Sequence, residues 1–169
     1  MISITQDIFN WSKKFLEKPN KHLGGMPVCP YAKKARENNK LKVIEVQESE
    51  KFLDKIIFAC DNFGVYDVVI VACEDMQISA DELNNYVHAL NKVYVPKDVY
   101  LIASYPDDEQ IDFLESLDYE PAREFYMVLI QSYQKLEDGS SSLSKTNYYK
   151  HWPEDYYADT VLLRKKYRR

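Results

Sequence analysis

The pattern that most constrains the fold of this chain is a set of four short apolar runs, separated by stretches of helical periodicity. The runs are LKVIEV (41–46), DVVIVAC (67–73), DVYLIASY (98–105) and REFYMVLIQSY (123–133). Runs of this length that are rich in Val, Ile and Tyr predict β-strands, and the run at 67–73 is continuously apolar, as a buried strand should be. Strands that alternate with helices predict an α/β or α+β fold, in which helices flank a four-stranded sheet and extra helices lie at both ends of the chain.

The stretches between these runs carry signals that begin and end helices. Ser3 is followed by Gln6, and Ser79 by Glu82, which is the spacing of a capping box at a helix start. We expect helices at about 4–17, 30–38, 49–64, 79–90, 106–117 and 153–169, the last two each opening on a proline. The segment KLEDGSSSLSKTN (135–147) is polar and rich in helix breakers, and it predicts a mobile loop.

Length and composition indicate a single globular domain over residues 1–169. Apolar residues make up 46% of the chain, and no apolar run approaches the roughly 18 residues of a membrane-spanning helix. The N-terminus lacks the pattern of a signal peptide. Cys29, Cys60 and Cys73 make an odd number without close spacing, which is typical of free thiols in a reducing compartment. We therefore expect a cytoplasmic protein without a membrane partner, and we expect Cys60 and Cys73 in the core.

Charge is distributed unevenly along the chain, although the net charge is only −5. Residues 1–42 hold nine Lys and Arg against three Asp and Glu, residues 43–139 hold six against 21, and residues 140–169 hold seven against three. One interpretation is a solvated surface on which the basic ends pair with the acidic middle. The other is that both basic ends converge on an anionic ligand. The acidic middle argues against a nucleic-acid surface over the whole fold.

Cys29 is the first candidate for chemistry, because it lies in GGMPVCPYAKKARE (24–37), directly before a basic helical pattern. The proline that follows it suits the first turn of a helix, which would place Cys29 at the N-cap. There the helix dipole would stabilise a thiolate, and positive potential would come from Lys33, Lys34 and Arg36. The alternative is a buried structural thiol, since free cysteine is commonly buried.

The segment CPYAKKARENNKLKVIEV (29–46) resembles the start of a glutaredoxin, in which a Cys-Pro-Tyr-Cys turn opens a helix that is followed by a strand. Ala32 stands where the second cysteine would be, so the resemblance implies at most a monothiol form with Cys29 as the nucleophile. Glutaredoxins also have a proline that faces the thiol. Its counterpart here would be Pro96, which lies far downstream.

A second resemblance spans more of the chain. The segments VCPYAKKAR, LIASYPDDEQIDF and TNYYKHWPEDYYADTVLLR occur in the same order as the short motifs of the DUF1415 family, bacterial proteins of unknown function. Tyr105 stands where that family has a histidine, so a histidine role does not carry over. The resemblance implies no activity, but it implies that Cys29, Pro30, the turn at 104–106 and Arg164 lie together in one constellation.

Other catalytic and binding motifs are absent or weak. His22, His88 and His151 are scattered without metal-ligand spacing, so we expect no metal site and no cofactor, and we interpret His88 as a satisfied or surface histidine. His22 or His151 could act as a base for Cys29 if the two ends of the chain fold together. The C-terminal stretch NYYKHWPEDYYADTVLLRKKYRR interleaves aromatic and basic residues. This is typical of nucleic-acid stacking or, as we favour, of a helix that docks on a core.

Two hypotheses of function follow. In the first, the protein is a small thiol-dependent enzyme or redox protein with Cys29 as the nucleophile and His151 as a candidate base. In the second, it is a non-catalytic module that binds an anionic ligand or partner through its basic, tyrosine-rich C-terminal segment, and Cys29 is structural. The candidate ligand-binding residues are Tyr31, Lys33, Lys34, Arg36, Trp152 and Arg164. We expect a small anionic ligand rather than nucleic acid, and the sequence leaves the oligomeric state open.

Overall fold

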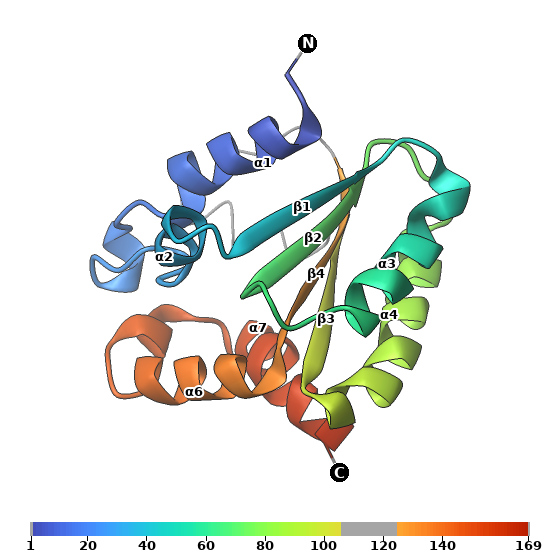
Figure 1. Cartoon of the computed structure of the whole chain (residues 1–169). Coiled ribbons are helices and arrows are strands. Elements are labelled where there is room, and N and C mark those ends of the chain that lie inside the picture. The colour runs from blue at the N-terminus through green and yellow to red at the C-terminus, as the bar shows by residue number, and fades with distance from the viewer. Residues whose placement is uncertain (1, 106–124, 169) are drawn as a thin grey trace.

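The protein is built around one mixed sheet (Figure 1). The computed structural model describes residues 2–105 and 125–168. Within them the strands are β1 (Leu41–Val46), β2 (Val68–Cys73), β3 (Val99–Ser104) and β4 (Tyr126–Ser132), in the spatial order β1-β2-β4-β3. β1 and β2 are parallel, whereas β4 lies between β2 and β3 and runs antiparallel to both. This arrangement confirms the predicted four-stranded sheet and decides for the α+β alternative.

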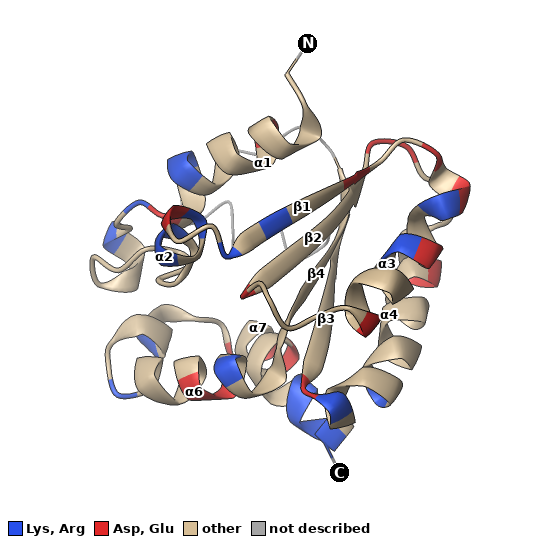
Figure 2. Cartoon of the chain, in the orientation of Figure 1, with Lys and Arg blue, Asp and Glu red and all other residues tan. Residues whose placement is uncertain are grey.

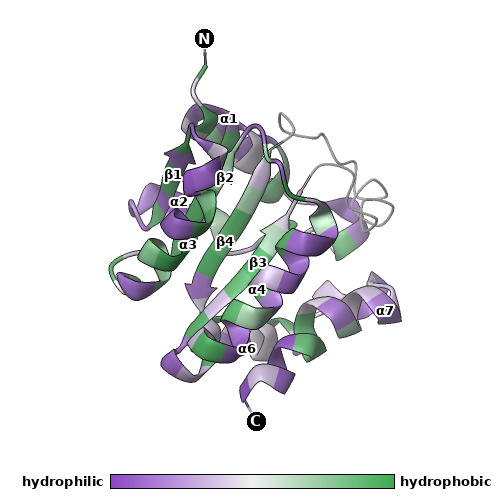
Figure 3. Cartoon of the chain, turned by 90° about the vertical axis from the view of Figure 1, so that its right-hand side faces the viewer, coloured by the Kyte–Doolittle hydropathy of each residue, from purple (hydrophilic) through white to green (hydrophobic). Residues whose placement is uncertain are grey.

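Helices α3 (Phe52–Asp61) and α4 (Ala80–Tyr94) cover one face of the sheet (Figure 1). In Figure 3 both helices alternate between hydrophilic and hydrophobic residues, as helices with one buried face do. The core of this face contains Phe52, Ile56, Leu83, Val87, Val71, Leu101, Val128 and Ile130. The predicted capping box is confirmed, because the Glu82 N–H donates to Ser79 Oγ at 3.2 Å and the Ser79 N–H donates to the Glu82 carboxylate at 2.7 Å.

Helix α1 (Ile4–Trp11) covers the opposite face, where Ile4 and Ile8 pack with Ile70 and Met127. It is shorter than predicted, since a π-helical turn follows at Ser12–Leu16. Ser3 caps the helix by accepting the Gln6 N–H at 3.2 Å, but the Gln6 side chain donates to Asn10 instead of reaching back. Only half of the predicted capping box therefore forms here.

Helix α6 (Tyr133–Leu143) occupies most of the segment in which the sequence predicted a mobile loop at 135–147. That prediction is wrong because tertiary contacts outweigh the weak helix propensity of a serine-rich segment. Ser132 Oγ accepts the Lys135 N–H at 3.1 Å, and the Asp98 carboxylate accepts the Gln134 N–H at 2.7 Å, so two N–H groups at the helix start are capped. At the other end of the helix Leu143 is buried.

The C-terminal segment (residues 145–168) is helical in short pieces rather than in one continuous helix. The pieces are a 3-10 helix Tyr148–His151, α7 (Glu154–Tyr157), a π-helical turn Ala158–Leu162 and a 3-10 helix Leu163–Arg168. Pro153 is the N-cap of α7, not its first helical residue. Tyr167 packs into a cluster with Tyr100 and Tyr133, so the predicted docking of this segment on the core is confirmed.

Three further predictions concern the cysteines, the helix at 106–117 and membrane-spanning segments. Cys60 and Cys73 are buried, as expected. The helix predicted at 106–117 lies outside the described residues. No helix within 2–105 and 125–168 has the length and apolar character needed to cross a membrane.

Candidate anion-binding site

The cysteine loop precedes helix α2 (Ala32–Glu37), but it does not place Cys29 at the helix N-cap. The N-cap residue is Tyr31, and the Ala32 N–H donates to the Cys29 carbonyl oxygen at 3.2 Å in the turn before it. The Cys29 N–H donates to the Leu16 carbonyl oxygen at 2.9 Å, which ties the loop to the N-terminal helices. The predicted position of Cys29 at the helix start is therefore wrong, because the two residues after it form a turn.

The surroundings of Cys29 raise the pKa of its thiol instead of lowering it. The largest cause is desolvation by burial, and the Glu17 carboxylate acts in the same direction. Hydrogen bonds from the backbone N–H groups of Tyr31 and Ala32 lower this pKa, but by less than burial raises it. At neutral pH the group is therefore a thiol, whereas nucleophilic chemistry needs the thiolate.

Both arginines that the sequence predicted as ligand-binding residues hold carboxylates of the protein itself. Arg36 donates to the Glu17 carboxylate through Nε and Nη2, each at 2.7 Å. Arg164 is 3% exposed, and its Nε donates to Glu137 Oε1 at 2.5 Å while its Nη2 donates to Ser140 Oγ. The Arg164 guanidinium is thus enclosed and neutralised where it lies.

Aromatic side chains join the cysteine loop to the C-terminal half of the chain. Tyr148 donates to the Val28 carbonyl oxygen, and Tyr31 donates to the Gly139 carbonyl oxygen at 3.4 Å. Trp152 packs in the same cluster, with its ring centroid 5.5 Å from that of Tyr148. The neighbours of Cys29 thus meet the C-terminal segment, while part of the turn at 104–106 lies outside the described residues.

The remaining predicted site residues are exposed. Lys33 and Lys34 lie on the surface of α2, and His151 lies at the end of the 3-10 helix that precedes α7. In the described part of the chain His151 has no hydrogen bond to Cys29. Within the described residues the structure therefore does not pair Cys29 with His151 as its base.

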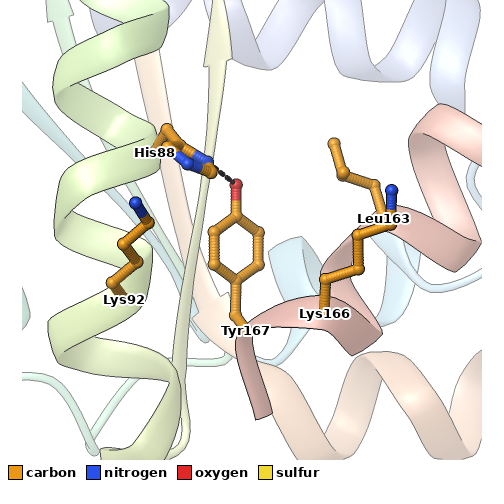
Figure 4. A pocket seen from close by; sticks show the side chains of 5 residues that line it. All are labelled: His88, Lys92, Leu163, Lys166 and Tyr167. Atoms are coloured by element: carbon orange, nitrogen blue, oxygen red, sulfur yellow. Dashed lines mark hydrogen bonds between the residues drawn. The ribbon is translucent and has the colours of Figure 1, made fainter. Parts of the chain in front are cut away.

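A pocket of about 320 Å³ opens elsewhere, between α4 and the C-terminal segment (Figure 4). Its lining residues are His88, Lys92, Leu163, Lys166 and Tyr167. In Figure 4 the Tyr167 ring stands between the two walls, with His88 and Lys92 on α4 and Lys166 and Leu163 on the other side. His88 Nδ1 lies 2.6 Å from Tyr167 Oη, and the two rings meet edge to face with centroids 5.2 Å apart.

The polar groups that line the pocket are hydrogen-bond donors or cations. Lys92 and Lys166 each offer an ammonium group. Burial raises the pKa of the Tyr167 phenol, although a hydrogen bond with Asn91 opposes the shift, so the hydroxyl keeps its proton at neutral pH. When that hydroxyl donates to His88 Nδ1, the imidazole carries its own proton on Nε2 and can donate it to a ligand. No carboxylate is among the five lining residues.

Helix α4 presents no acid near the pocket, although it belongs to the acidic middle of the chain. The positions one helical turn on either side of His88 are Asn84, Asn85, Asn91 and Lys92. Along this helix an anion in the pocket would therefore meet His88 and Lys92 rather than a repelling carboxylate. In the part of the chain that the structure describes, no group of three or more His, Cys, Asp or Glu side chains could hold a metal ion.

Comparison with known proteins gives a family but no activity. Residues 5–113 match a family described as a domain of unknown function, DUF6875. The chain belongs to the DUF6875 family. The resemblance to DUF1415 is not confirmed by this match, and no curated protein or solved structure matches the chain. The DUF6875 match includes Cys29, His88 and Lys92 but ends before the C-terminal segment, which supplies the other wall of the pocket.

The sequence did not reveal this pocket. His88 and Lys92 lie one helical turn apart, and the chain ends in a basic run, so both halves of the signal were present. The sequence does not show that the C-terminal run lies beside His88 and Lys92. The docking of the C-terminal segment depends on Tyr100, Tyr133 and Glu137, which lie on three other parts of the fold. The interpretation of His88 as a satisfied histidine is confirmed by its bond to Tyr167.

Proposed function

We propose that this DUF6875 protein is a non-catalytic module that binds a small anionic ligand in the pocket between α4 and the C-terminal segment. The observation that carries the proposal is that Lys92, Lys166 and the hydrogen-bonded pair of His88 and Tyr167 line one pocket, with no carboxylate among its five lining residues. Cationic side chains around a pocket give it a positive potential, which attracts an anion.

The size and position of the pocket also support a ligand. Its volume of about 320 Å³ falls at the lower end of the range for small-molecule sites. One wall comes from the basic C-terminal segment, in keeping with the binding-module hypothesis drawn from the sequence. None of the six ligand-binding residues predicted from the sequence lines it, so the proposal keeps the class of ligand and changes the residues that bind it.

A thiol-dependent activity has less support. The raised pKa of Cys29 removes the thiolate that this hypothesis needs, and Arg36 and Arg164 are already paired with Glu17 and Glu137. We therefore treat Cys29 as a structural residue that fixes the turn before α2.

The proposal is tested by the shift in melting temperature when sodium chloride is replaced by sodium sulfate at equal ionic strength. A ligand that binds only the folded state raises the melting temperature by mass action. Sulfate also stabilises proteins in general, because it is excluded from their surfaces. Variants must therefore separate the part of the melting-temperature shift that comes from binding in the pocket from this general effect. We expect Lys92→Gln and Lys166→Gln each to lose most of the site-specific part of the sulfate shift.

The matched control is Lys33→Gln, which removes an exposed lysine far from the pocket in sequence and on a different helix. This variant should keep the full sulfate shift of the unmodified protein. An equal sulfate shift in all four proteins would mean that sulfate acts only as a general stabiliser, and the proposed function would be wrong.

A further inference from the structure

We propose that two copies of this chain pair through their β1 strands, antiparallel to each other, so that their two sheets join into one continuous sheet. The proposal is independent of the anion pocket. Among the four described strands β1 and β3 are the opposite edges of the sheet, and the pocket lies on the β3 side, where Tyr167 packs against Tyr100. Three properties of β1 support the pairing: the backbone groups at its outer edge, its exposure and its charge.

The outer edge of β1 carries backbone groups that have no hydrogen-bond partner in the described part of the chain. The neighbour of β1 in the sheet is β2, and the Lys40 carbonyl oxygen accepts the Val68 N–H from it at 3.1 Å. In a parallel pair, both backbone groups of every second residue face the neighbouring strand. Counting from Lys40, the residues that bond to β2 are Lys42, Ile44 and Val46. The residues whose N–H and C=O groups point to the free edge are Leu41, Val43 and Glu45.

This edge of the sheet is open, whereas the edge at β3 is covered. Val99, Tyr100 and Leu101 at the start of β3 are all buried. Along β1 the buried residues are Val43 and Val46, and no described helix crosses the strand in Figure 1. β1 contains no proline, and its register with β2 runs without a bulge. An open edge of this kind is a template for another strand.

The charges along β1 favour a second copy of this chain as that strand. Lys40 and Lys42 lie at its start, Glu48 and Glu50 follow its end, and all four side chains are exposed. Figure 2 shows this change from basic to acidic along the strand. Parallel pairing of two copies would place lysine beside lysine and glutamate beside glutamate. Antiparallel pairing about a two-fold axis places the basic start of each strand beside the acidic end of the other.

One register brings these charges directly opposite each other. With Ile44 opposite Ile44 of the second copy, Lys40 lies opposite Glu48, and the outward-facing backbone groups of the two strands also meet. Lysine on an edge strand commonly prevents pairing, but here Glu48 supplies the opposite charge. Lys40 Nζ donates to the Val65 carbonyl oxygen and Glu48 accepts from Lys51, and these surface contacts contribute little that the pairing would lose.

The proposal is tested by sedimentation velocity over a series of protein concentrations, with amide hydrogen exchange measured at both ends of the series. We expect a reversible monomer–dimer equilibrium, because an interface of two short strands is small. On dimerisation the amides of Val43 and Glu45 should exchange more slowly, because they acquire partners. The amides of Lys42 and Ile44 are the internal control, since they bond to β2 in either state and should not change. A dimer through another surface would not produce this alternation.

Charge-reversal variants then tie the dimer to β1. Lys40→Glu and Glu48→Lys should each weaken dimerisation about tenfold, because each places like charges opposite one another at both ends of the paired strands. An equimolar mixture of these two variants should dimerise as well as the unmodified protein, since opposite charges then meet again at both ends. Lys145→Glu is the matched control, because it makes the same change at an exposed lysine beyond α6, and it should leave dimerisation unchanged.

Four results would overturn the proposal. The first is a protein that stays monomeric at every concentration. The second is a dimer in which the exchange of Val43 and Glu45 does not slow, because another surface would then hold the two copies together. The third is an equal loss of dimer in Lys145→Glu and Lys40→Glu, which would show that net charge controls association. The fourth is a mixture of the two β1 variants that does not recover the dimer, which would contradict antiparallel pairing.

Discussion

At the scale of single residues, Cys29 shows how burial can cancel a favourable sequence context. A cysteine beside a proline and a lysine-rich helix has the neighbours of a reactive thiol, and two backbone N–H groups do bond to it. Desolvation by burial outweighs those bonds, so the pKa of Cys29 rises. The positive charges of Lys33 and Lys34 were expected to stabilise a thiolate at Cys29. Both side chains lie exposed on α2, where water screens their charge.

The reactivity of Cys29 follows from this environment. We expect native Cys29 to react with iodoacetamide more slowly than a free thiol at pH 7, with a rate that still increases above pH 9, because the thiolate fraction stays small. Site-resolved mass spectrometry across a pH series measures this rate. Cys60 serves as the comparison, since burial raises its pKa to about 12. A Cys29 rate that levels off below pH 7.5 would show that the thiol is activated.

At the scale of structural elements, the C-terminal segment is anchored by one enclosed ion pair. Arg164 reaches Glu137 on α6 with its side chain 4% exposed, and Lys165 approaches the same carboxylate at 3.9 Å. Removing one partner of such a pair leaves the other charge without compensation. The cost of losing Arg164 should therefore exceed that of losing a surface arginine.

We predict that Arg164→Met lowers the free energy of unfolding by about 3 kcal/mol. The double variant Arg164→Met/Glu137→Met should recover part of that loss, because it removes both charges. Urea unfolding measures these differences. Arg168→Met is the matched control, since Arg168 is exposed, donates to the Gln134 side chain at 2.9 Å and lies over the Tyr133 ring, and it should cost under about 1 kcal/mol. Equal losses in Arg164→Met and Arg168→Met would contradict the anchoring role.

A second ion pair fixes α2 against the N-terminal helices and should make stability depend on pH. The hydrogen bond from Arg36 is the largest cause that holds the pKa of Glu17 below its ordinary value. A carboxyl whose folded-state pKa is lowered stabilises the fold above its ordinary pKa of about 4.5, and this contribution is lost as pH falls through the lowered value.

We therefore expect Glu17→Gln to be less stable than the unmodified protein by about 1 to 2 kcal/mol at pH 6, and the difference to shrink steadily toward pH 3. Urea unfolding at a series of pH values measures both. Glu37→Gln is the control, because the Glu37 side chain is 55% exposed and 4.0 Å from Arg36. A difference between Glu17→Gln and the unmodified protein that stays constant from pH 6 to pH 3 would contradict this linkage.

The sequence predicted the strands better than the beginnings and ends of the helices. The four strands were predictable because each is a continuous or alternating apolar run, and the start of α4 because Ser79 and Glu82 cap locally. Helix α6 was not predictable, since its first N–H groups are capped by Ser132 and by Asp98 from another part of the chain. The break after α1 was missed because the apolar period continues through Phe15 although the backbone changes to a π-helical turn.

At the scale of the whole molecule, charge is segregated rather than evenly paired. Figure 2 shows basic residues around α2 and the C-terminal end, and acidic residues along α3 and the loops that follow β1 and β2. The interpretation that basic ends pair with the acidic middle holds for Arg164 and Lys165, which share Glu137. Arg36 instead pairs with Glu17 within the N-terminal region itself.

The candidate site depends on this large-scale arrangement, so the sequence could suggest an anionic ligand but not where it would bind. A basic C-terminus and an anionic ligand were expected from charge counts alone. The surface against which the C-terminal segment packs could not be predicted from charge counts, because β3, α4 and α6 together create the surface on which Tyr167 docks. Our proposal therefore requires that anions bind in the pocket where α4 and the C-terminal segment meet.

The most direct test is a two-dimensional NMR titration of the isotopically labelled protein with sodium sulfate, at ionic strength held constant with sodium chloride. We predict saturable shifts of the His88 imidazole signals and of the backbone amides of Lys92, Lys166 and Tyr167, with the amides around Lys33 unchanged. Shifts that follow sulfate linearly without saturation, or that cluster on α2 and leave His88 still, would contradict it.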